Sequence, residues 1–256
     1  MNLFSIKNKR VLITGGTAGI GLAVAQHFIA EGAKVAICGR REEGSKTAHS
    51  IGAIFIKMNV TDSDSVEKGM SIAAQTLGAI DLLILNAGIG DSEGTIEDLA
   101  PTTFKKVFDV NVNGVMSCMR IGLKWLSPNA GVIITSSPAS VTFLAGMGAY
   151  SASKAAINAL VKTWSIELAS KNIRVNAVMP GIVKTEMTNA GEDPEAELEA
   201  LKKFTQNGKI RQPEELGGVF QFLASNAAET ITGAIIACDD GISAGYSNLV
   251  LDKLFE

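Results

Sequence analysis

Tyr150 and Lys154 form a pair that could perform acid–base chemistry. They stand four residues apart in Tyr150-Ser151-Ala152-Ser153-Lys154, which on a helix places both side chains on one face. A phenol with an unperturbed pKa of about 10 donates a proton poorly at neutral pH, and a neighbouring ammonium group lowers that pKa. Ser137 could hydrogen-bond the oxygen that gains or loses the proton. A chance pair on an amphipathic helix and a serine that caps a turn would look the same, so the surrounding elements must decide.

Seven short apolar runs alternate with segments of helical periodicity along the chain. The expected strands cover residues 10–14, 35–38, 53–58, 82–85, 132–135, 174–178 and 234–237. Nearly continuous apolar strands that alternate with helices are typical of a parallel sheet covered on both faces. We therefore predict a Rossmann-like, doubly wound α/β fold of about seven strands, with residues 1–256 forming a single domain.

Composition limits the partners and the location of the protein. The formal net charge is −3 over 256 residues, and we find no basic cluster large enough to follow a nucleic-acid backbone. No apolar run approaches the roughly 18 residues of a membrane span, and the first residues do not resemble a secretory signal. Cys38, Cys118 and Cys238 are scattered without metal-binding spacing. We expect reduced thiols, no metal, no nucleic-acid or membrane partner and a cytoplasmic protein.

A glycine-rich turn between the first expected strand and the first expected helix indicates nucleotide binding. Residues 14–21 read Thr-Gly-Gly-Thr-Ala-Gly-Ile-Gly, with the spacing G-x-x-x-G-x-G. Glycines permit a tight turn and let backbone amides approach a pyrophosphate, which the helix N-terminus also attracts. The predicted contacts in this turn are Gly15, Thr17, Ala18, Gly19, Ile20 and Gly21.

The end of the second expected strand favours NADP(H) over NAD(H). An acid at this position would bond the 2′-hydroxyl of NAD, whereas arginine accommodates the 2′-phosphate of NADP. The chain has Arg40 and Arg41 there, and its next acid is Glu42. A guanidinium group suits a phosphate because it offers two parallel hydrogen bonds. An exposed basic turn would have the same sequence, so NAD remains possible.

Further cofactor contacts are predicted at the ends of the third and fourth strands. These are Asn59 and Val60 after the third strand and Asn86, Ala87 and Gly88 after the fourth, which could equally be ordinary turn residues. A polar interval over 189–208 follows the sixth strand and contains an expected helix over 192–204. Because ligands bind at the carboxyl edge of open α/β sheets, we predict a substrate lid over about 186–210, with a solvated surface helix as the alternative.

Taken together, these motifs resemble the classical short-chain dehydrogenase/reductase (SDR) family over almost the whole chain. They are T-G-x-x-x-G-x-G, Asn86-Ala87-Gly88, Asn111, a serine thirteen residues before the tyrosine, Y-x-x-x-K and Pro180-Gly181. The resemblance implies that Tyr150 is the general acid in carbonyl reduction and the base in alcohol oxidation. It further implies that Lys154 lowers the pKa of Tyr150 and binds the nicotinamide ribose, that Ser137 orients the substrate oxygen, and that Asn111 holds a relay water.

The resemblance also implies a nicotinamide wall formed by Pro180, Gly181, Val183 and Thr185, and assembly as a homotetramer or homodimer. An apolar tail over 242–251 agrees with association, because exposed apolar patches usually find partners. Two positions depart from the family pattern. Asn59 replaces a usual aspartate and Leu85 the first asparagine of N-N-A-G, which should weaken or rearrange contacts to the adenine.

We therefore expect a dinucleotide-binding oxidoreductase that transfers a hydride between NADP(H) and a ketone or secondary alcohol, a small-molecule substrate. The alternatives are an NAD(H)-dependent alcohol or polyol dehydrogenase, a 3-oxoacyl-carrier-protein reductase and a non-catalytic nucleotide-sensing protein. An acidic carrier protein calls for basic residues beside the site, and residues 127–131 contain none. The apolar run over 141–148 favours an apolar or mixed substrate, or else belongs to an oligomer interface.

Overall fold

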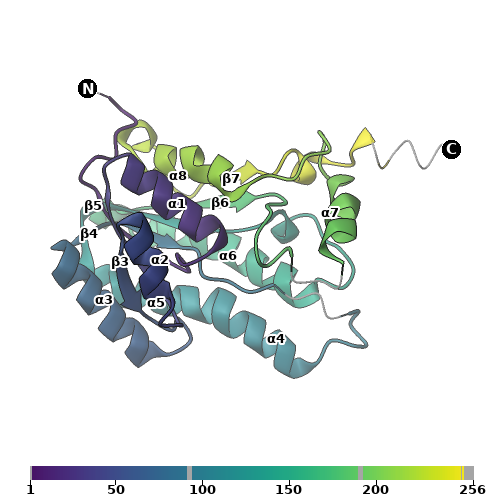
Figure 1. The fold of residues 1–256 in the computed structure, drawn as a ribbon, viewed down its shortest axis with the longest axis horizontal. Coiled ribbons are helices and arrows are strands. Elements are labelled where there is room, and N and C mark those ends of the chain that lie inside the picture. The colour runs from purple at the N-terminus through teal and green to yellow at the C-terminus, as the bar shows by residue number, and fades with distance from the viewer. Residues whose placement is uncertain (1, 91–93, 190–192, 249, 251–256) are drawn as a thin grey trace.

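The computed structural model describes residues 2–90, 94–189, 193–248 and 250, and these residues contain a seven-stranded parallel sheet (Figure 1). The strands are β1 Arg10–Thr14, β2 Lys34–Gly39, β3 Ile54–Lys57, β4 Ile80–Leu85, β5 Leu126–Thr135, β6 Arg174–Pro180 and β7 Ile235–Cys238. Their order is β3-β2-β1-β4-β5-β6-β7, so the predicted strands and fold class are confirmed. The order reverses between β1 and β4, the position where doubly wound sheets bind dinucleotides.

Helices cover both faces of the sheet. They are α1 Gly19–Ala30, α2 Gly44–Ile51, α3 Ser63–Leu77, α4 Pro101–Phe108, α5 Gly114–Gly122, α6 Gly148–Glu167, α7 Pro194–Lys202 and α8 Gly217–Ala224. Alternate residues of β1 separate the two apolar layers. Leu12 packs with side chains of α3, α5 and α6, whereas Val11 and Ile13 pack with those of α1 and α8. Burial of successive residues on opposite faces explains why the strands are apolar throughout.

Because all strands are parallel, their carboxyl ends meet at one edge of the sheet. The segments that leave this edge hold every predicted site residue except Asn111, Tyr150 and Lys154, which lie on helical segments. The site residues at the edge lie in residues 15–21 after β1, 40–41 after β2, 59–60 after β3, 86–88 after β4, 137 after β5 and 180–185 at the end of β6. The topology therefore places residues far apart in sequence at one location.

The helix predicted within 192–204 is present as α7, although residues 190–192 lie outside the described part of the chain. Asp193 caps it by accepting a hydrogen bond from the Ala196 amide (3.2 Å), and Pro194 occupies its first position. No residue of α7 is buried. Figure 1 shows α7 at the right-hand end of the molecule. Its side chains are exposed or half-buried, and none belongs to either apolar layer.

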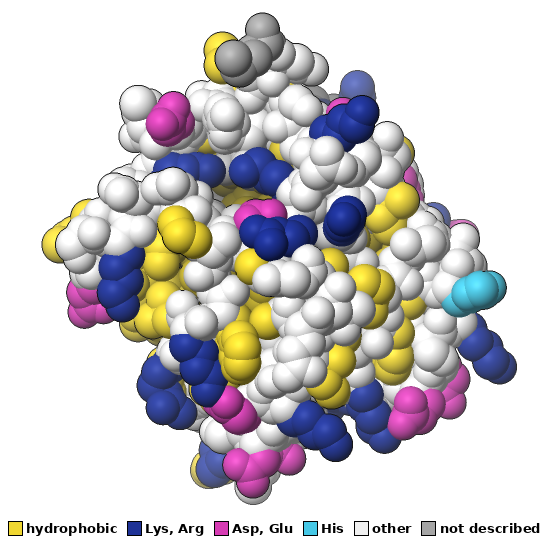
Figure 2. All heavy atoms as spheres, turned by 90° about the vertical axis from the view of Figure 1, so that its left-hand side faces the viewer, with side chains coloured by type: hydrophobic (Ala, Val, Ile, Leu, Met, Phe, Trp, Pro, Cys, Tyr) yellow, Lys and Arg dark blue, Asp and Glu magenta, His cyan; other side chains and the backbone are white. Residues whose placement is uncertain are grey.

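The amino edge of the sheet is joined by an ion pair between two strands. Arg10 of β1 donates from its amide (2.9 Å) and guanidinium (2.8 and 2.6 Å) to Asp81 of β4, which also accepts from Ser127 of β5 (2.7 Å). On the face that Figure 2 shows, Lys and Arg side chains are spread among acidic and apolar ones. Within the described ranges, no helix has both the length and the apolarity needed to cross a membrane.

Candidate active site

Three of the four predicted catalytic side chains converge where β5 ends and α6 begins. Ser137 has an extended backbone (φ −161°, ψ 151°), as expected for a residue that precedes proline. Its side chain is hydrogen-bonded to that of Tyr150. Lys154 Nζ lies 5.5 Å from the centre of the Tyr150 ring and donates to the Thr135 carbonyl oxygen at 2.9 Å. This arrangement can position an oxygen-containing substrate and exchange a proton with it.

Asn111 lies behind these residues in a π-helical turn, Asp109–Asn113, which joins α4 to α5. Its amide group is fully buried, donates to the Ile89 carbonyl oxygen (2.9 Å) and Ser153 Oγ (3.1 Å), and accepts from the Ile89 amide (2.9 Å). Both of its hydrogens are therefore occupied. A relay water at Asn111 stays a prediction. Such a water would have to donate a hydrogen bond either to the side-chain Oδ1 or to the backbone carbonyl oxygen of Asn111.

Gly88 adjoins both Asn111 and Lys154. A Cβ at Gly88 would lie 3.3 Å from Asn111 Oδ1 and 3.7 Å from Lys154 Nζ. The segment after β4 thus approaches both Asn111 and Lys154. A side chain at this glycine would crowd the space next to the ammonium group.

Burial shifts the acidity of both titratable groups at the centre of the site. It lowers the pKa of Lys154 to about 8. It also raises the pKa of Tyr150, and the hydrogen bond with Ser137 partly opposes that rise, although the tyrosine keeps some exposed surface. The net shift is upward, opposite to the fall expected from a neighbouring ammonium group, and burial is its largest cause. Lys154 is not among the causes of this shift, so its effect on the pKa of the phenol stays a prediction.

The glycine turn has the backbone shape that a pyrophosphate site requires. Gly15 and Gly19 have positive φ angles of 65° and 52°. A Cβ at Gly21 would lie only 2.3 Å from the Gly15 carbonyl oxygen, so a larger residue would displace the turn. No side chain caps the helix that follows, because its N-cap residue is Ala18. The first amides of α1 can therefore receive the oxygens of an anion, and the residues present fit a dinucleotide.

The predicted 2′-phosphate residues lie beside this turn. A Cβ at Gly39 would lie 2.8 Å from the Thr17 methyl group, so the β2 end adjoins the glycine turn. Arg40 and Arg41 are exposed, and no ion pair joins either of them to another described residue. The nearest acid, Glu42, instead pairs with Lys57 at 2.6 Å. The arrangement leaves two guanidinium groups available for an anion.

Asn86 supports the glycine turn with its side chain. Its Nδ2 donates to the Gly15 carbonyl oxygen and its Oδ1 accepts from the Thr135 hydroxyl, both at 3.1 Å. The Thr14 hydroxyl accepts from the amides of Asn86 (3.0 Å) and Ala87 (3.1 Å). Asn86 was predicted to contact the cofactor directly, whereas its amide group connects β1, β4 and β5. Sequence reasoning missed the roles of Thr14 and Thr135.

Asn59 is also engaged within its own loop. Its Oδ1 accepts from the Thr61 amide (3.3 Å) and hydroxyl (3.1 Å), which forms a local turn. Val60, the next residue, is buried, and a Cβ at Gly114 would lie 2.9 Å from its methyl group. An adenine at this loop would meet an amide NH₂ donor where the family usually offers an aspartate acceptor.

The predicted nicotinamide wall runs from the end of β6 to the glycine turn. Gly181 passes so close to β7 that a Cβ would lie 2.7 Å from the Asp239 Cα. Val183 is buried and pairs as an isolated bridge with Arg211. A Cβ at Gly19 would lie 3.3 Å from the Thr185 methyl group. The segment that begins at Pro180 therefore spans the distance between the catalytic group and the pyrophosphate turn.

Comparison with known proteins agrees with this geometry. A family model described as Enoyl-(Acyl carrier protein) reductase matches residues 15–243. The crystal structure of a short-chain type dehydrogenase/reductase from Mycobacterium marinum superposes with a TM-score of 0.87 at 32% identity, covering 95% of this chain and 99% of that one. The chain belongs to the SDR family.

Two curated relatives extend the comparison. A 3alpha-hydroxysteroid dehydrogenase from Mediterraneibacter gnavus is 36% identical over 245 residues, which is 91% of this chain and 96% of the relative. An NADP-dependent (R)-specific alcohol dehydrogenase from Lentilactobacillus kefiri is 33% identical over 249 residues, 93% of this chain and 98% of the relative. The protein is thus an NAD(P)-dependent oxidoreductase that acts on an alcohol or a ketone, with a small-molecule substrate.

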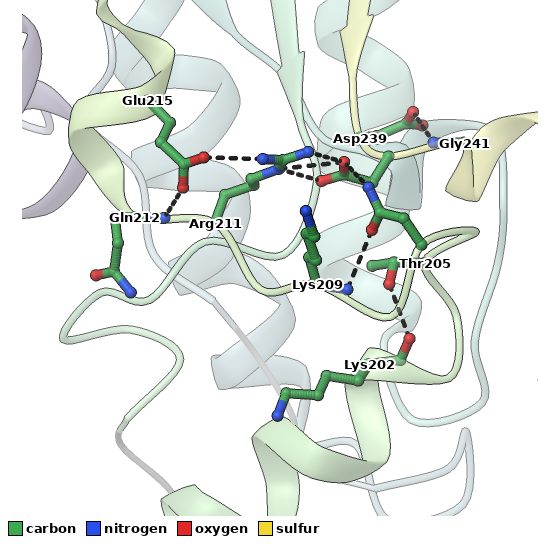
Figure 3. A network of polar contacts seen from close by, with 10 residues as sticks. Lys202, Thr205, Lys209, Arg211, Gln212, Glu215, Asp239 and Gly241 are labelled. Atoms are coloured by element: carbon green, nitrogen blue, oxygen red, sulfur yellow. Dashed lines mark hydrogen bonds and ion pairs between the residues drawn. The ribbon is translucent and has the colours of Figure 1, made fainter.

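In this SDR, an arginine that the sequence did not single out connects the base of the predicted lid to the sheet. The Arg211 amide donates to the Ile182 carbonyl oxygen (3.0 Å), and the Arg211 carbonyl accepts from the Lys184 amide (2.8 Å). Its guanidinium pairs with Asp240 after β7 through three contacts at 3.1, 2.8 and 2.5 Å, and with Glu215 at 2.8 Å. Figure 3 shows the guanidinium facing Glu215. Arg211 is the residue that follows the predicted lid, and these contacts fix it to the predicted nicotinamide wall and to the loop after β7.

Proposed function

We propose that this SDR reduces a ketone, or oxidises the corresponding secondary alcohol, with NADP(H) as cofactor and Tyr150 as general acid–base. The observation that carries the proposal is the convergence of Ser137, Tyr150 and Lys154 at the carboxyl end of β5, beside Gly88. All four residues predicted for the chemistry, including Asn111, are contributed by this chain. A purely nucleotide-sensing protein has no need for such a set.

In the proposed reduction, Ser137, Tyr150 and Lys154 each have a separate role. A carbonyl oxygen bound between the Ser137 and Tyr150 hydroxyls receives a hydrogen bond from each and then takes the proton of Tyr150. When bound, NADPH supplies the hydride to the carbonyl carbon. Lys154, which burial leaves mostly protonated at pH 7 because its pKa is about 8, keeps a positive charge near the phenolate that results. Positive charge at that place stabilises the product state of the tyrosine.

The proposed binding site for NADP(H) uses backbone more than side chains. The uncapped start of α1 and the Gly15–Gly21 turn receive the pyrophosphate, and the segment from Pro180 to Thr185 borders the nicotinamide. Arg40 and Arg41 receive the 2′-phosphate. The pairing of Glu42 with Lys57 agrees with this choice, because that acid faces a lysine rather than the two arginines. The NADP dependence named for the Lentilactobacillus kefiri relative points the same way.

Cofactor choice is tested by binding rather than turnover. NADPH and NADH affinities are measured by fluorescence titration for the wild type, for Arg40→Ala and for Arg41→Ala, with Arg120→Ala as a control at an arginine outside the site. We expect tighter binding of NADPH and a loss of that preference in the first two variants. Equal affinities that no variant changes would refute the assignment.

The catalytic proposal is tested on a panel of ketones with NADPH, followed at the absorbance of the reduced nicotinamide. Steroids belong in the panel because a relative is a 3alpha-hydroxysteroid dehydrogenase, and an acyl-thioester belongs there because of the description of the matching family model. Tyr150→Phe should lower kcat by about 10²- to 10⁴-fold, the contribution of general acid–base catalysis. The chain has one other tyrosine, so Tyr246→Phe is the matched control and should retain activity. Turnover that survives in Tyr150→Phe would refute the mechanism.

We further propose that the 186–210 segment acts as a lid, that the protein is cytoplasmic and that it forms a homo-oligomer. Exposed apolar side chains support association, among them Phe143 (68% exposed), Ile166 (78%) and Tyr246 (81%). Of the tail residues predicted to take part, Leu249 and Leu251 lie outside the described part of the chain. Light scattering at micromolar concentration should show a dimer or tetramer, and a monomer would remove the assembly proposal.

A further inference from the structure

Asn158 connects the helix that carries Tyr150 to both sides of Ser137. It lies on α6, eight residues after Tyr150 and four after Lys154, and it is half-buried. Ser136 Oγ donates to its Oδ1 at 2.7 Å, and its Nδ2 donates to Ser140 Oγ at 2.7 Å. Ser136 and Ser140 are themselves buried, with 3% and 6% of their surfaces exposed. The amide group therefore bridges two hydroxyls of the loop that holds Ser137.

The hydrogen bonds continue from Ser140 into the backbone of Ser137. Ser140 Oγ donates to the Ser137 carbonyl oxygen at 2.6 Å, and the Ser140 amide donates to the same oxygen at 3.0 Å. On the other side, the Ser136 amide donates to the Val178 carbonyl oxygen of β6 at 2.8 Å. A hydroxyl has one hydrogen, and the Ser137 carbonyl oxygen lies closer to Ser140 Oγ (2.6 Å) than the other acceptor, Met179 Sδ (3.5 Å). The order of donors is therefore Ser136 to Asn158, Asn158 to Ser140, and Ser140 to the Ser137 carbonyl.

We propose that Asn158 is a positioning residue for the SDR reaction, which holds the Ser137 hydroxyl against Tyr150 by fixing the loop on both sides of Ser137 to α6. The inference rests on the catalytic roles proposed above for Ser137 and Tyr150. Both catalytic hydroxyls must be held close to their productive geometry, because a displacement of about 1 Å can cost roughly 10²-fold in rate. The connection from Asn158 supplies that constraint from a residue that touches neither reacting group.

Only an amide of this length provides the required pair of contacts. One end of the amide accepts from Ser136 while the other donates to Ser140, which leaves the Ser140 hydrogen free for Ser137. The carboxylate of Asn158→Asp offers acceptors alone and would draw the Ser140 hydrogen away from the Ser137 carbonyl. Asn158→Leu keeps similar volume and removes both contacts. Ser140→Ala interrupts the series of bonds one step nearer to Ser137.

The first test separates positioning from a general loss of stability. Asn158→Asp, Asn158→Leu and Ser140→Ala are compared with Ser165→Ala, which removes another buried hydroxyl of α6 (8% exposed, bonded to the Lys162 carbonyl oxygen at 2.7 Å). We expect the first three variants to lose about tenfold or more in kcat, as the loss of a well-placed hydrogen bond implies, with NADPH affinity unchanged. Ser165→Ala should keep its kcat. The proposal would be overturned if Asn158→Asp, Asn158→Leu and Ser140→Ala all kept the kcat of the Ser165→Ala control.

The pH profile supplies a readout that a structural role would not move. The hydrogen bond from Ser137 lowers the pKa of Tyr150, so loosening Ser137 should raise that pKa. Alcohol oxidation needs the ionised tyrosine, so the rising limb of its pH profile should move to higher pH in Asn158→Leu, as it should in Ser137→Ala. An unchanged limb in Asn158→Leu, together with a shifted limb in Ser137→Ala, would overturn the proposal.

A second test needs no turnover and so stands apart from the proposed function. Tyr150 and Tyr246 are the two tyrosines of the chain, and in a Tyr246→Phe background the tyrosinate absorbance reports Tyr150 alone. Asn158→Leu in this background should titrate at higher pH than its parent, and Ser165→Ala should titrate with the parent. Coincident curves for Asn158→Leu and its parent would overturn the positioning role, whereas active Tyr150→Phe would overturn the proposed function instead.

Discussion

The buried ammonium group of Lys154 should make the stability of the protein depend on pH in a way that one substitution removes. Burial lowers the pKa of Lys154 from 10.5 to about 8. One pKa unit corresponds to about 1.4 kcal/mol, so the charged form costs about 3 kcal/mol in the folded protein relative to the unfolded chain. Lys154→Met keeps most of the apolar stem and removes this cost.

The sign of the effect follows from which state binds the proton more tightly. The folded-state pKa lies below the unfolded value, so between about pH 8 and 10.5 the unfolded chain binds more protons than the folded protein. The cost is therefore fully present below pH 8 and is lost as the pH rises toward 10.5. Between pH 8 and pH 10 the free energy of unfolding of the wild type should rise by about 2 kcal/mol relative to Lys154→Met.

Urea denaturation followed by circular dichroism at pH 7, 8, 9 and 10 measures this difference directly. Lys154→Met also loses the hydrogen bond to the Thr135 carbonyl oxygen, so the change with pH is more diagnostic than the difference at one pH. Lys162→Met removes an exposed lysine of the same helix and should show no such change. A difference between wild type and Lys154→Met that stays constant from pH 7 to 10 would refute the reasoning.

Three further predictions concern the cofactor turn, the amino edge and the lid. Gly21→Ala places a methyl group about 2.3 Å from a backbone oxygen and should lower NADPH affinity at least tenfold in a fluorescence titration, whereas Gly218→Ala, with open space around it, should not. Burial would raise the pKa of Asp81, but its arginine partner on β1 brings it down to about 2, so Asp81→Asn should lower the urea midpoint at pH 7. The difference in urea midpoint between wild type and Asp81→Asn should shrink as the pH falls from about 3.8 toward 2. A difference that persists at pH 2 would contradict a stabilising role for ionised Asp81. Arg211→Gln removes the charge that pairs with Asp240. This change should raise the KM for NADPH and the KM for the ketone more than it lowers kcat, and it should speed proteolysis within 186–210.

The sequence was sufficient for the sheet because the strand signals are local and strong. Each strand is a short apolar run, and the glycine turn stands between the first run and the first helix, so the order of elements follows directly. Parallel pairing then places the strand ends at one edge without further information. The extended backbone of Ser137 was predictable for the same reason, because Pro138 restricts the residue before it.

The connections between distant segments could not be predicted from patterns. Arg211 pairs with Asp240 across 29 residues, and Asn158 bonds Ser136 across 22. Neither spacing carries a periodic signal. One feature of the sequence indicated a role for Asn158: it is a polar residue four positions after Lys154, on the same face of the expected helix. The net rise in the pKa of Tyr150 could not be predicted, because burial depends on every element packed around the phenol, whereas the sequence displays only its nearest charged neighbour.

Burial acts on Tyr150 and Lys154 with one common consequence, since it disfavours the charged form of each. The tyrosine is therefore held as the neutral phenol across the physiological range, which is the form that can give a proton to a carbonyl oxygen. Formation of the phenolate is costly unless a positive charge lies beside it, and Lys154 is held 5.5 Å from the ring centre by the Thr135 carbonyl oxygen. The Ser137 hydrogen bond is the one contact among these that already favours the phenolate. The position of the Ser137 hydroxyl is therefore important for ionisation of Tyr150, and the hydrogen bonds from Asn158 are the contacts we propose to fix that position.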